Sequence, residues 1–301
     1  MCSFKHVIHN YQGDITLERY KTTKRVAVLG ITANILLLIS KLAVGFSSSS
    51  QAMIADGFNS AGDVFASVMT YAGNRISSQP EDQSHPYGHG KAEYIFSMII
   101  SFSLLLVAYK VFRSSLEAII NRETFIFSWW LVAIAAATII IKLILFIYTK
   151  AVGKKHNNLL ITANSEDHRN DVFVTSSTLL GIILGTMGIY WVDGVVGIVI
   201  SIWIAYTGFK IFNSAYHVLM DRNIDRLLKN DIEKVIKSID GIDHIDDIAA
   251  KPVGINYILI VKISVPGSIT VNESHSIAAQ VREKLRNNDR VNDVVVHINP
   301  V

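Results

Sequence analysis

The chain has 301 residues, of which 50% are hydrophobic and 18% charged, and its mean hydropathy is +0.35. Soluble domains carry about 25% charged residues, so this composition argues against an ordinary soluble enzyme. The net charge of +3 is too small to indicate nucleic-acid binding, and the single cysteine, Cys2, excludes a disulfide framework or a thiolate metal cluster. There is no Gly-x-x-x-x-Gly-Lys-Ser/Thr motif, so ATP-driven pumping is not supported.

The charged residues are unevenly distributed along the chain. Residues 221–301 hold 11 Lys or Arg and 12 Asp or Glu, whereas the 220 residues before them hold 17 and 13. The C-terminal density is ordinary for a soluble fold, and the earlier density is far below it. We therefore predict a transmembrane domain over residues 1–214 and a soluble domain over residues 215–301.

The first 24 residues are polar and lack the apolar segment of a cleaved signal peptide. Six apolar stretches follow, each near the roughly 20 residues that a bilayer core requires. They cover about 25–46, 52–73, 93–113, 126–150, 160–184 and 188–212. The second and fifth stretches carry acids and amides in an apolar frame. The sequence thus predicts an α-helical membrane protein with six transmembrane helices.

Basic residues suggest the orientation of these helices. Arg75 and Lys91 lie between the second and third stretches, and three lysines lie between the fourth and fifth: Lys150, Lys154 and Lys155. By the positive-inside rule, these loops, the N-terminus and the C-terminal domain are cytoplasmic, although Arg113 and Arg122 fall on the other side. We expect a multi-pass protein of the plasma or inner membrane.

The soluble domain shows a different periodicity. Residues 230–239 predict a short amphipathic helix, and residues 242–250 and 257–265 alternate like strands. Residues 271–285 return to helical spacing, and residues 291–298 predict a final strand. The order α-β-β-α-β indicates a small α+β sandwich.

Two oxygen-bearing pairs stand out in the polar transmembrane stretches. Asn59 and Asp63 lie four residues apart in the second, and Asp167 and Asp171 lie four apart in the fifth. Each pair is followed by Val-Phe. Residues at this spacing share one helical face, so two facing helices would bring four oxygen donors together.

Such a cluster needs a compensating charge. Ionisable groups inside a membrane cost several kcal/mol unless they are paired or hydrated, and three gathered aspartates repel one another. A divalent cation between Asp63, Asp167 and Asp171 is the simplest solution. The alternative is a structural pairing of these acids, for instance with Arg169.

Three segments together resemble the cation diffusion facilitator family. They are residues 56–63, residues 167–171, and the loop His85-Pro-Tyr-Gly-His89-Gly-Lys91-Ala-Glu93. The resemblance covers nearly the whole chain. It implies a homodimeric transporter, not an enzyme, that exports divalent metal against protons by alternating access, with a cytoplasmic dimerisation domain. Its partners would be the lipid bilayer, metal ions and protons, with no organic cofactor and no nucleic acid.

The resemblance implies that the transport site comprises Asn59, Asp63, Asp167 and Asp171. Zinc-carrying members use at least one histidine, commonly where Asn59 or Asp167 stands here. Oxygen ligands suit manganese, which lies at the weak end of the affinity series, so a manganese site must lose nitrogen ligands. We predict Mn²⁺ as the substrate, as in the manganese-exporting branch, then Fe²⁺, with Zn²⁺ or Cd²⁺ behind.

Two neighbours complete this site. Asp56 lies one turn before Asn59. It is interpreted either as a residue that supports the ligands or lies on the entry path of the ion, or as a purely structural residue. His168 lies about 100° around the helix from Asp167, so we expect a neighbour rather than a ligand.

The resemblance implies further metal positions outside the membrane. Asp82, His85 and His89 match a family site in the loop, where the alternative is that they cap or pack it. Of the family's histidine-rich two-metal site in the soluble domain, His275 and His297 remain, and Asp246 or Asp247 stands where one ligand is expected. A binuclear site needs more ligands than these, so exposed residues at a dimer surface are the favoured interpretation.

Lys91 and Asp221 fall where the family places a charge pair at the membrane face. This pair would hold the two protomers together or tie the spans to the soluble domain. Two other functions stay open. A non-transporting metal sensor or scaffold would need a metal site with a full set of ligands in the soluble domain. A channel would bind its ion less tightly than a dense acidic cluster does.

Overall fold

A computed structural model of the chain describes residues 2–47, 51–121, 129–186, 191–224, 226–254, 256–288 and 290–301. Some side chains inside these ranges lie outside that description, namely those of residues 2–17, 45, 47, 51–59, 118, 121, 131, 178, 181–186 and 191–193. The chain forms two compact units. The helical unit comprises Met1–Ser78 and Ala92–Ala215, and the C-terminal unit comprises Gln79–Lys91 and Tyr216–Val301.

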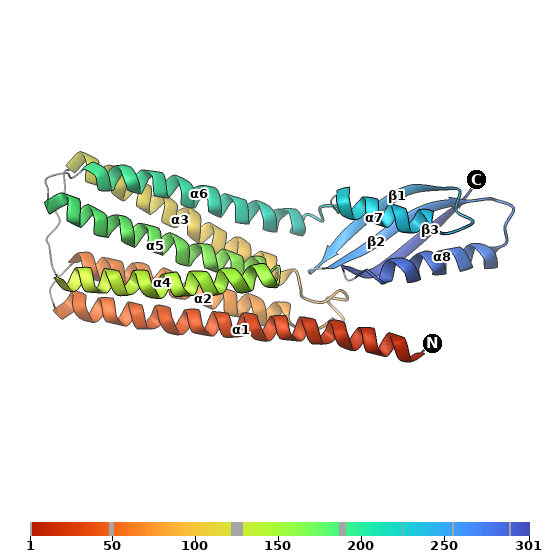
Figure 1. Cartoon of the computed structure of the whole chain (residues 1–301), viewed down its shortest axis with the longest axis horizontal. Helices are drawn as coiled ribbons and strands as arrows, with labels where there is room; N and C mark the ends of the chain where they lie inside the picture. Colours follow the sequence, from red (N-terminus) through yellow and green to blue (C-terminus); the bar gives the residue numbers. More distant parts are fainter. Residues whose placement is uncertain are drawn as a thin grey trace. The chain divides into compact units, whose positions relative to one another are not determined.

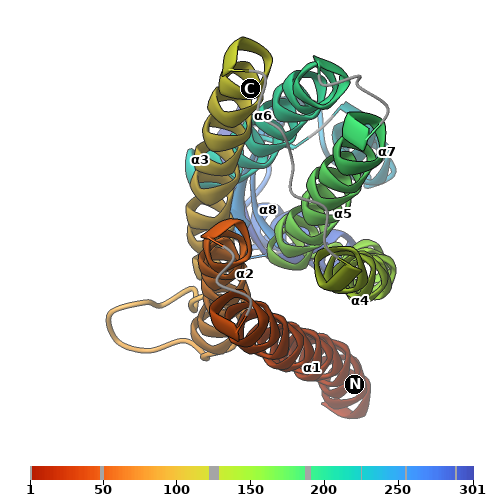
Figure 2. The ribbon, with the colours of Figure 1, turned by 90° about the vertical axis from the view of Figure 1, so that its left-hand side faces the viewer.

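Long helices build the helical unit (Figures 1 and 2). They are α1 (Cys2–Ser47), α2 (Gln51–Ser77), α3 (Ala92–Asn121), α4 (Trp129–Lys155), α5 (Leu159–Thr186) and α6 (Trp191–Leu219). Among the described residues, four segments are long and apolar enough to cross a membrane: Glu18–Val44, Ala92–Glu117, Val132–Lys155 and Gly194–Leu219. These four lie in α1, α3, α4 and α6. Helices α2 and α5 are the two that carry the polar residues noted above.

Helix α1 begins earlier than the sequence suggested. The predicted polar segment of the first 24 residues is itself helical and continuous with the first apolar stretch, since the helix begins at Cys2. Part of this polar end serves helix packing. Arg19 and Thr23 are buried, and the Asn158 side chain donates a hydrogen bond of 3.3 Å to the Thr23 hydroxyl. The segment therefore anchors the turn between α4 and α5.

Small residues allow the helices to approach closely. A Cβ added to Gly197 of α6 would lie 2.0 Å from the Ser115 hydroxyl of α3. A Cβ added to Gly73 of α2 would lie 2.7 Å from the Cβ of Phe96 in α3. Since lipid is as apolar as a leucine side chain, such close packing is a main source of helix association in membranes.

The C-terminal unit contains the predicted order α-β-β-α-β. Its elements are α7 (Arg226–Lys237), β1 (His244–Val253), β2 (Asn256–Val265), α8 (Val271–Arg286) and β3 (Val291–Pro300). The sheet order is β1-β2-β3, with β1 antiparallel and β3 parallel to the central β2. The periodicity predicted these elements because each has a buried face. In α7, for example, Leu228, Ile232 and Ile236 recur every four residues and are all buried.

The loop before α3 belongs to the C-terminal unit rather than to the helices that it joins. The Lys251 ammonium lies 5.8 Å from the centre of the Tyr87 ring. Gly254, at the turn between β1 and β2, has a φ of +60°, and a Cβ on Gly90 would lie 2.7 Å from its Cα. Loop and turn thus approach backbone to backbone, which side chains at either glycine would prevent.

Candidate metal centre

Helices α2 and α5 bring three aspartates together. Asp63 lies on α2, and Asp167 and Asp171 lie one turn apart on α5. The exposed fractions of Asp63 and Asp167 are only 7% and 6%, and Asp171 is half-buried. We call these three residues the acidic cluster. The side chains of the other two predicted members of this region, Asn59 and Asp56, lie outside the described residues.

A lysine from α4 lies inside the acidic cluster. The Lys142 ammonium donates a hydrogen bond of 2.8 Å to Asp63 Oδ2 and one of 2.5 Å to Asp171 Oδ2. Its side chain is only 1% exposed. The sequence pattern does not single out this lysine, which lies in a nearly all-apolar stretch. The signal was present: Lys142 is the only charged residue between Trp129 and Thr149, and an isolated intramembrane charge marks a functional region.

The structural alternative was that the three acids pair with a cation of the protein, for instance Arg169, but Arg169 has other partners. Arg169 forms its ion pair with Glu166 on its own helix, and its Nη2 donates a hydrogen bond of 3.1 Å to the Thr207 hydroxyl of α6. Arg169 is thus engaged toward Glu166 and α6, whereas the cation at the acidic cluster is Lys142. Two of the acids are thus paired within the protein, and the divalent cation predicted among them stays a prediction.

Two side chains of α5 are left with unused ligand atoms. Asp167 Oδ2 and both ring nitrogens of His168 are buried and have no hydrogen-bond partner among the described residues. Ligand atoms of Asp167, His168 and Asp171 lie within 4.8 Å of one another. His168 is therefore nearer to the acids than its helical angle suggested. Buried polar atoms are normally satisfied, so these atoms fit a bound cation.

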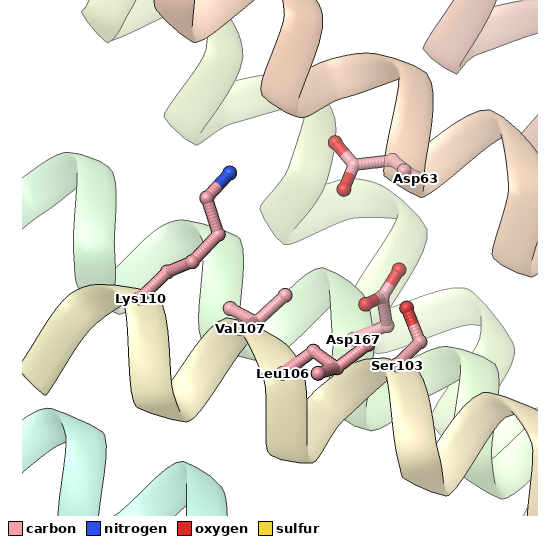
Figure 3. Close-up of a pocket in the computed structure, with 7 residues that line it drawn as sticks. Asp63, Ser103, Leu106, Val107, Lys110 and Asp167 are labelled. Carbon is pink, nitrogen blue, oxygen red and sulfur yellow. The ribbon is translucent and has the colours of Figure 1, made fainter.

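A cavity of about 150 Å³ opens beside the acidic cluster (Figure 3). It is lined by Gly62, Asp63, Ser103, Leu106, Val107, Lys110 and Asp167. Each water in the liquid occupies about 30 Å³, so the cavity has room for an ion with part of its hydration shell. Two of the three acids thus face a space that a hydrated cation can occupy.

Buried polar groups continue from the acidic cluster along α1, α2 and α5. The Asn34 amide of α1 donates to the backbone carbonyl of Asp63, at 3.1 Å, and to the Ser67 hydroxyl, at 3.0 Å. A Cβ on Gly30 would lie 3.0 Å from the Ser67 hydroxyl and 3.9 Å from Asn164 Oδ1. The side chain of Asn164 is completely buried. Its amide lies one turn before Asp167, so polar groups extend along α5 beyond the acids.

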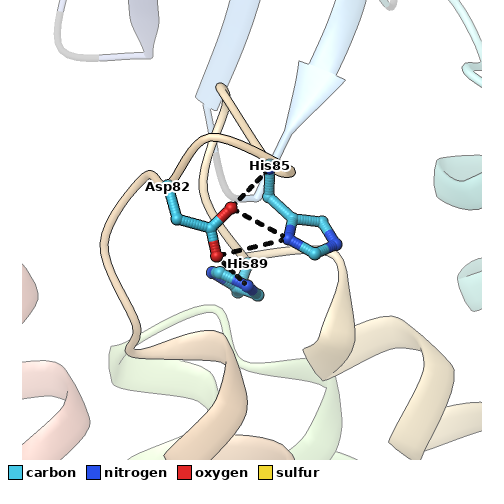
Figure 4. Close-up of side chains that lie close together, drawn as sticks. All are labelled: Asp82, His85 and His89. Carbon is cyan, nitrogen blue, oxygen red and sulfur yellow. Dashed lines mark hydrogen bonds and ion pairs between the residues drawn. The ribbon is translucent and has the colours of Figure 1, made fainter.

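The loop residues predicted as a further metal position also lie together (Figure 4). Asp82 is 3.2 Å from His85 Nδ1 and 3.4 Å from His89 Nε2, and the two imidazole ring centres are 4.3 Å apart. The backbone N–H of His85 donates to the Asp82 carboxylate, which lowers the pKa of that carboxyl. We call these three residues the loop cluster.

The predicted metal position of the C-terminal unit, formed by Asp246, His275 and His297, is less complete than the loop cluster. Asp246 lies at an irregularity of β1, where the register with β2 shifts, and it accepts hydrogen bonds from the Ser264 hydroxyl and the Asn299 amide. His297 is 3.0 Å from Asn299 Oδ1, so Asn299 lies between the two predicted ligands. His275 is exposed on α8.

The predicted charge pair is present. The Lys91 ammonium lies 2.5 Å from Asp221 Oδ1, which joins the residue before α3 to the segment after α6.

The sequence matches two family descriptions that together cover nearly all of it. The "Cation efflux transmembrane domain" matches residues 27–220, and the "Cation efflux protein, cytoplasmic domain" matches residues 224–301. The chain therefore belongs to the cation efflux, or cation diffusion facilitator, family of membrane transporters. Its C-terminal unit, with the three-stranded sheet, corresponds to the cytoplasmic domain of that family.

Full-length relatives support this assignment. The chain is 32% identical to the manganese efflux system protein MneS of Bacillus subtilis over 292 residues, covering 95% of this chain and 99% of MneS. It is 29% identical to MneP of the same organism, over 94% and 98% of the two chains. The uncharacterized transporter MJ0449 of Methanocaldococcus jannaschii is 32% identical, over 93% and 99%.

Proposed function

We propose that this protein exports Mn²⁺ in exchange for protons, by alternating access around the acidic cluster. The observation that carries the proposal is the meeting of Asp63, Asp167 and Asp171, of which Asp63 and Asp167 are buried and line a cavity. Carboxylates suit manganese, and the efflux of manganese named for MneS and MneP supports the same choice. Entry of a divalent cation displaces protons from whichever of these acids hold them, which supplies the exchange.

All six long helices would span the bilayer in this function. Helices α2 and α5 are less apolar than the other four because they carry the ligands, which face the interior of the bundle rather than lipid. We place both termini in the cytoplasm of a plasma or inner membrane protein. The basic residues Lys154 and Lys155 in the last turn of α4 support that orientation.

The working unit would be a homodimer assembled through the C-terminal unit. The loop cluster is a second metal position in this proposal, because one carboxylate and two imidazoles already converge there. Lys91 and Asp221 would couple α3 and α6 to that unit. Asp246, His275 and His297 would lie at the dimer surface, because Asp246 and His297 use Asn299 as their partner.

Zn²⁺, Fe²⁺ or Cd²⁺ is the second candidate substrate, and one observation favours it. His168 offers a buried nitrogen within 4.8 Å of ligand atoms of Asp167 and Asp171. Imidazole suits zinc better than manganese, so ligation by His168 would move the preference toward Zn²⁺.

The test is transport into vesicles by the purified full-length protein, with Mn²⁺, Zn²⁺, Fe²⁺ and Cd²⁺ measured in parallel. We expect Mn²⁺ flux in the wild type, accompanied by proton counterflow, and its loss in Asp63→Ala and Asp171→Ala. A matched control is Asp231→Ala, because Asp231 is exposed on α7 and pairs only with Lys234 of its own helix among the described residues. Mn²⁺ flux that persists in both site variants would refute the proposed site.

A further inference from the structure

Lys142 is costly to bury, yet it is placed in the middle of an apolar helix. Its side chain is 1% exposed, and only apolar or uncharged residues surround it in α4 from Trp129 to Thr149. Removing an ammonium group from water costs several kcal/mol even after relaxation. Two carboxylates of the acidic cluster offset that cost, and the same contacts reduce the mutual repulsion of the acids.

The ammonium group and a metal ion would compete for the same carboxylates. Lysine has three N–H donors and no lone pair, so it cannot ligate a metal. Its contacts use Oδ2 of Asp63 and Oδ2 of Asp171, one oxygen from each helix of the site. A cation that bridges α2 and α5 through these oxygens must replace the ammonium there.

Resting on the transport site proposed above, we propose that Lys142 is the counter-cation of the empty site, which the entering metal displaces from Asp63 and Asp171. In the empty carrier, the ammonium offsets one of three acidic charges, so the site can change conformation without three uncompensated carboxylates in an apolar core. In the loaded carrier, the metal takes over this role. Lys142 then weakens metal binding and supports the return of the empty carrier.

The displaced ammonium has another acceptor within reach of its own helix. The Thr138 hydroxyl lies one turn before Lys142, is 2% exposed, and has no hydrogen-bond partner among the described residues. Helical side chains lean toward the N-terminus, and the lysine side chain is long and flexible. The ammonium can therefore leave the acids without leaving the protein.

Two substitutions at this position should change metal affinity in opposite directions. Lys142→Met removes the competing charge, so we expect purified full-length protein to bind Mn²⁺ at least about tenfold more tightly, while Mn²⁺ transport slows. Lys142→Arg introduces a planar guanidinium group, whose several N–H donors bind two carboxylates more tightly, so the Mn²⁺ affinity should fall by about threefold or more. A merely structural lysine would not give shifts of opposite sign.

The matched control is Lys150→Met, an exposed lysine on the same helix, for which binding and transport should equal those of the wild type. Calorimetric titration at fixed pH measures the affinities, and flux into vesicles measures transport. If Lys142→Met does not fold, Lys142→Arg alone decides: unchanged or tighter Mn²⁺ binding overturns the inference. Unchanged affinity in a folded Lys142→Met also overturns it. A wild type that binds none of the four metals instead refutes the proposed function.

Discussion

The Arg19 guanidinium lies 2.5 Å from Glu93 Oε2, and both side chains are almost fully buried. The second carboxylate oxygen of Glu93 accepts the backbone N–H of Leu159 at 3.0 Å. Glu93 lies in the first turn of α3, yet its carboxylate caps the start of α5 and pairs with α1. One carboxylate therefore joins three helices.

Glu93→Gln should destabilise the helical unit strongly. The substitution leaves the Arg19 charge buried without its partner, which costs roughly 3–5 kcal/mol for a buried ion pair. Thermal unfolding in detergent measures the loss. The control is Glu117→Gln on the same helix, whose pair with Arg113 has side chains 51% and 68% exposed and should contribute about 0–1 kcal/mol. Equal effects of the two substitutions would contradict this prediction.

Gly73→Ala should also destabilise the bundle, for a steric reason. The new methyl would lie 2.7 Å from the Phe96 Cβ and 2.8 Å from Leu160 Cδ2, so α2 must move away from α3 and α5. We expect a loss of about 1–3 kcal/mol, the usual cost of overpacking. Gly62→Ala on the same helix is the control, since its methyl would meet no atom within 4 Å. A melting temperature unchanged by Gly73→Ala would show that the contact can relax.

His168→Gln should change Mn²⁺ affinity by less than about threefold, because oxygen ligands from the acidic cluster would hold this metal. The same substitution should weaken Zn²⁺ binding by about tenfold or more if the imidazole contributes to a zinc site. Titration of both metals into the full-length protein distinguishes the two substrates. Loss of Mn²⁺ binding on the scale of Asp171→Ala would make His168 a manganese ligand, contrary to this expectation.

The C-terminal unit should show a pH-dependent contact at His244. A hydrogen bond with Asp243, at 2.7 Å, and the nearby Asp246 carboxylate raise the pKa of His244. Because the folded-state pKa is raised, the contact is fully present below the ordinary histidine pKa of about 6.5 and is lost as pH rises through the raised value. Asp243→Asn should lower this pKa, measured by NMR titration of the imidazole.

Asp247→Asn is the matched control for that titration, since Asp247 is an exposed neighbour on the same strand. It should move the His244 pKa less than Asp243→Asn does. A titration curve that is the same in Asp243→Asn as in the wild type would contradict the assigned cause.

The features that could be predicted from the sequence are those that follow from the periodicity of residues within a single helix or strand. The spacing of Asp167 and Asp171 placed both on one face of α5, and the buried faces of α7 and α8 gave the order of the C-terminal unit. The ends of elements were less well predicted: α7 begins at Arg226, four residues before the predicted helix, and this additional turn contributes Leu228 to the buried face.

The sequence did not reveal relationships between segments. The sequence of α4 does not indicate that Lys142 faces α2 and α5, because a single charged residue forms no periodic pattern that could assign it to one face of the helix. Helical geometry also placed His168 off the ligand stripe, but a buried imidazole can turn its ring toward either neighbour. Which helices meet, and at what depth, is decided by packing across the bundle.

The near contact of Gly90 with Gly254 holds the loop before α3 against the β1–β2 turn. Backbone pressed against backbone has no side chain to absorb a shift. Larger residues at Gly90 or Gly254 would therefore have to push the loop away from the turn, because no rotamer change could relieve the overlap.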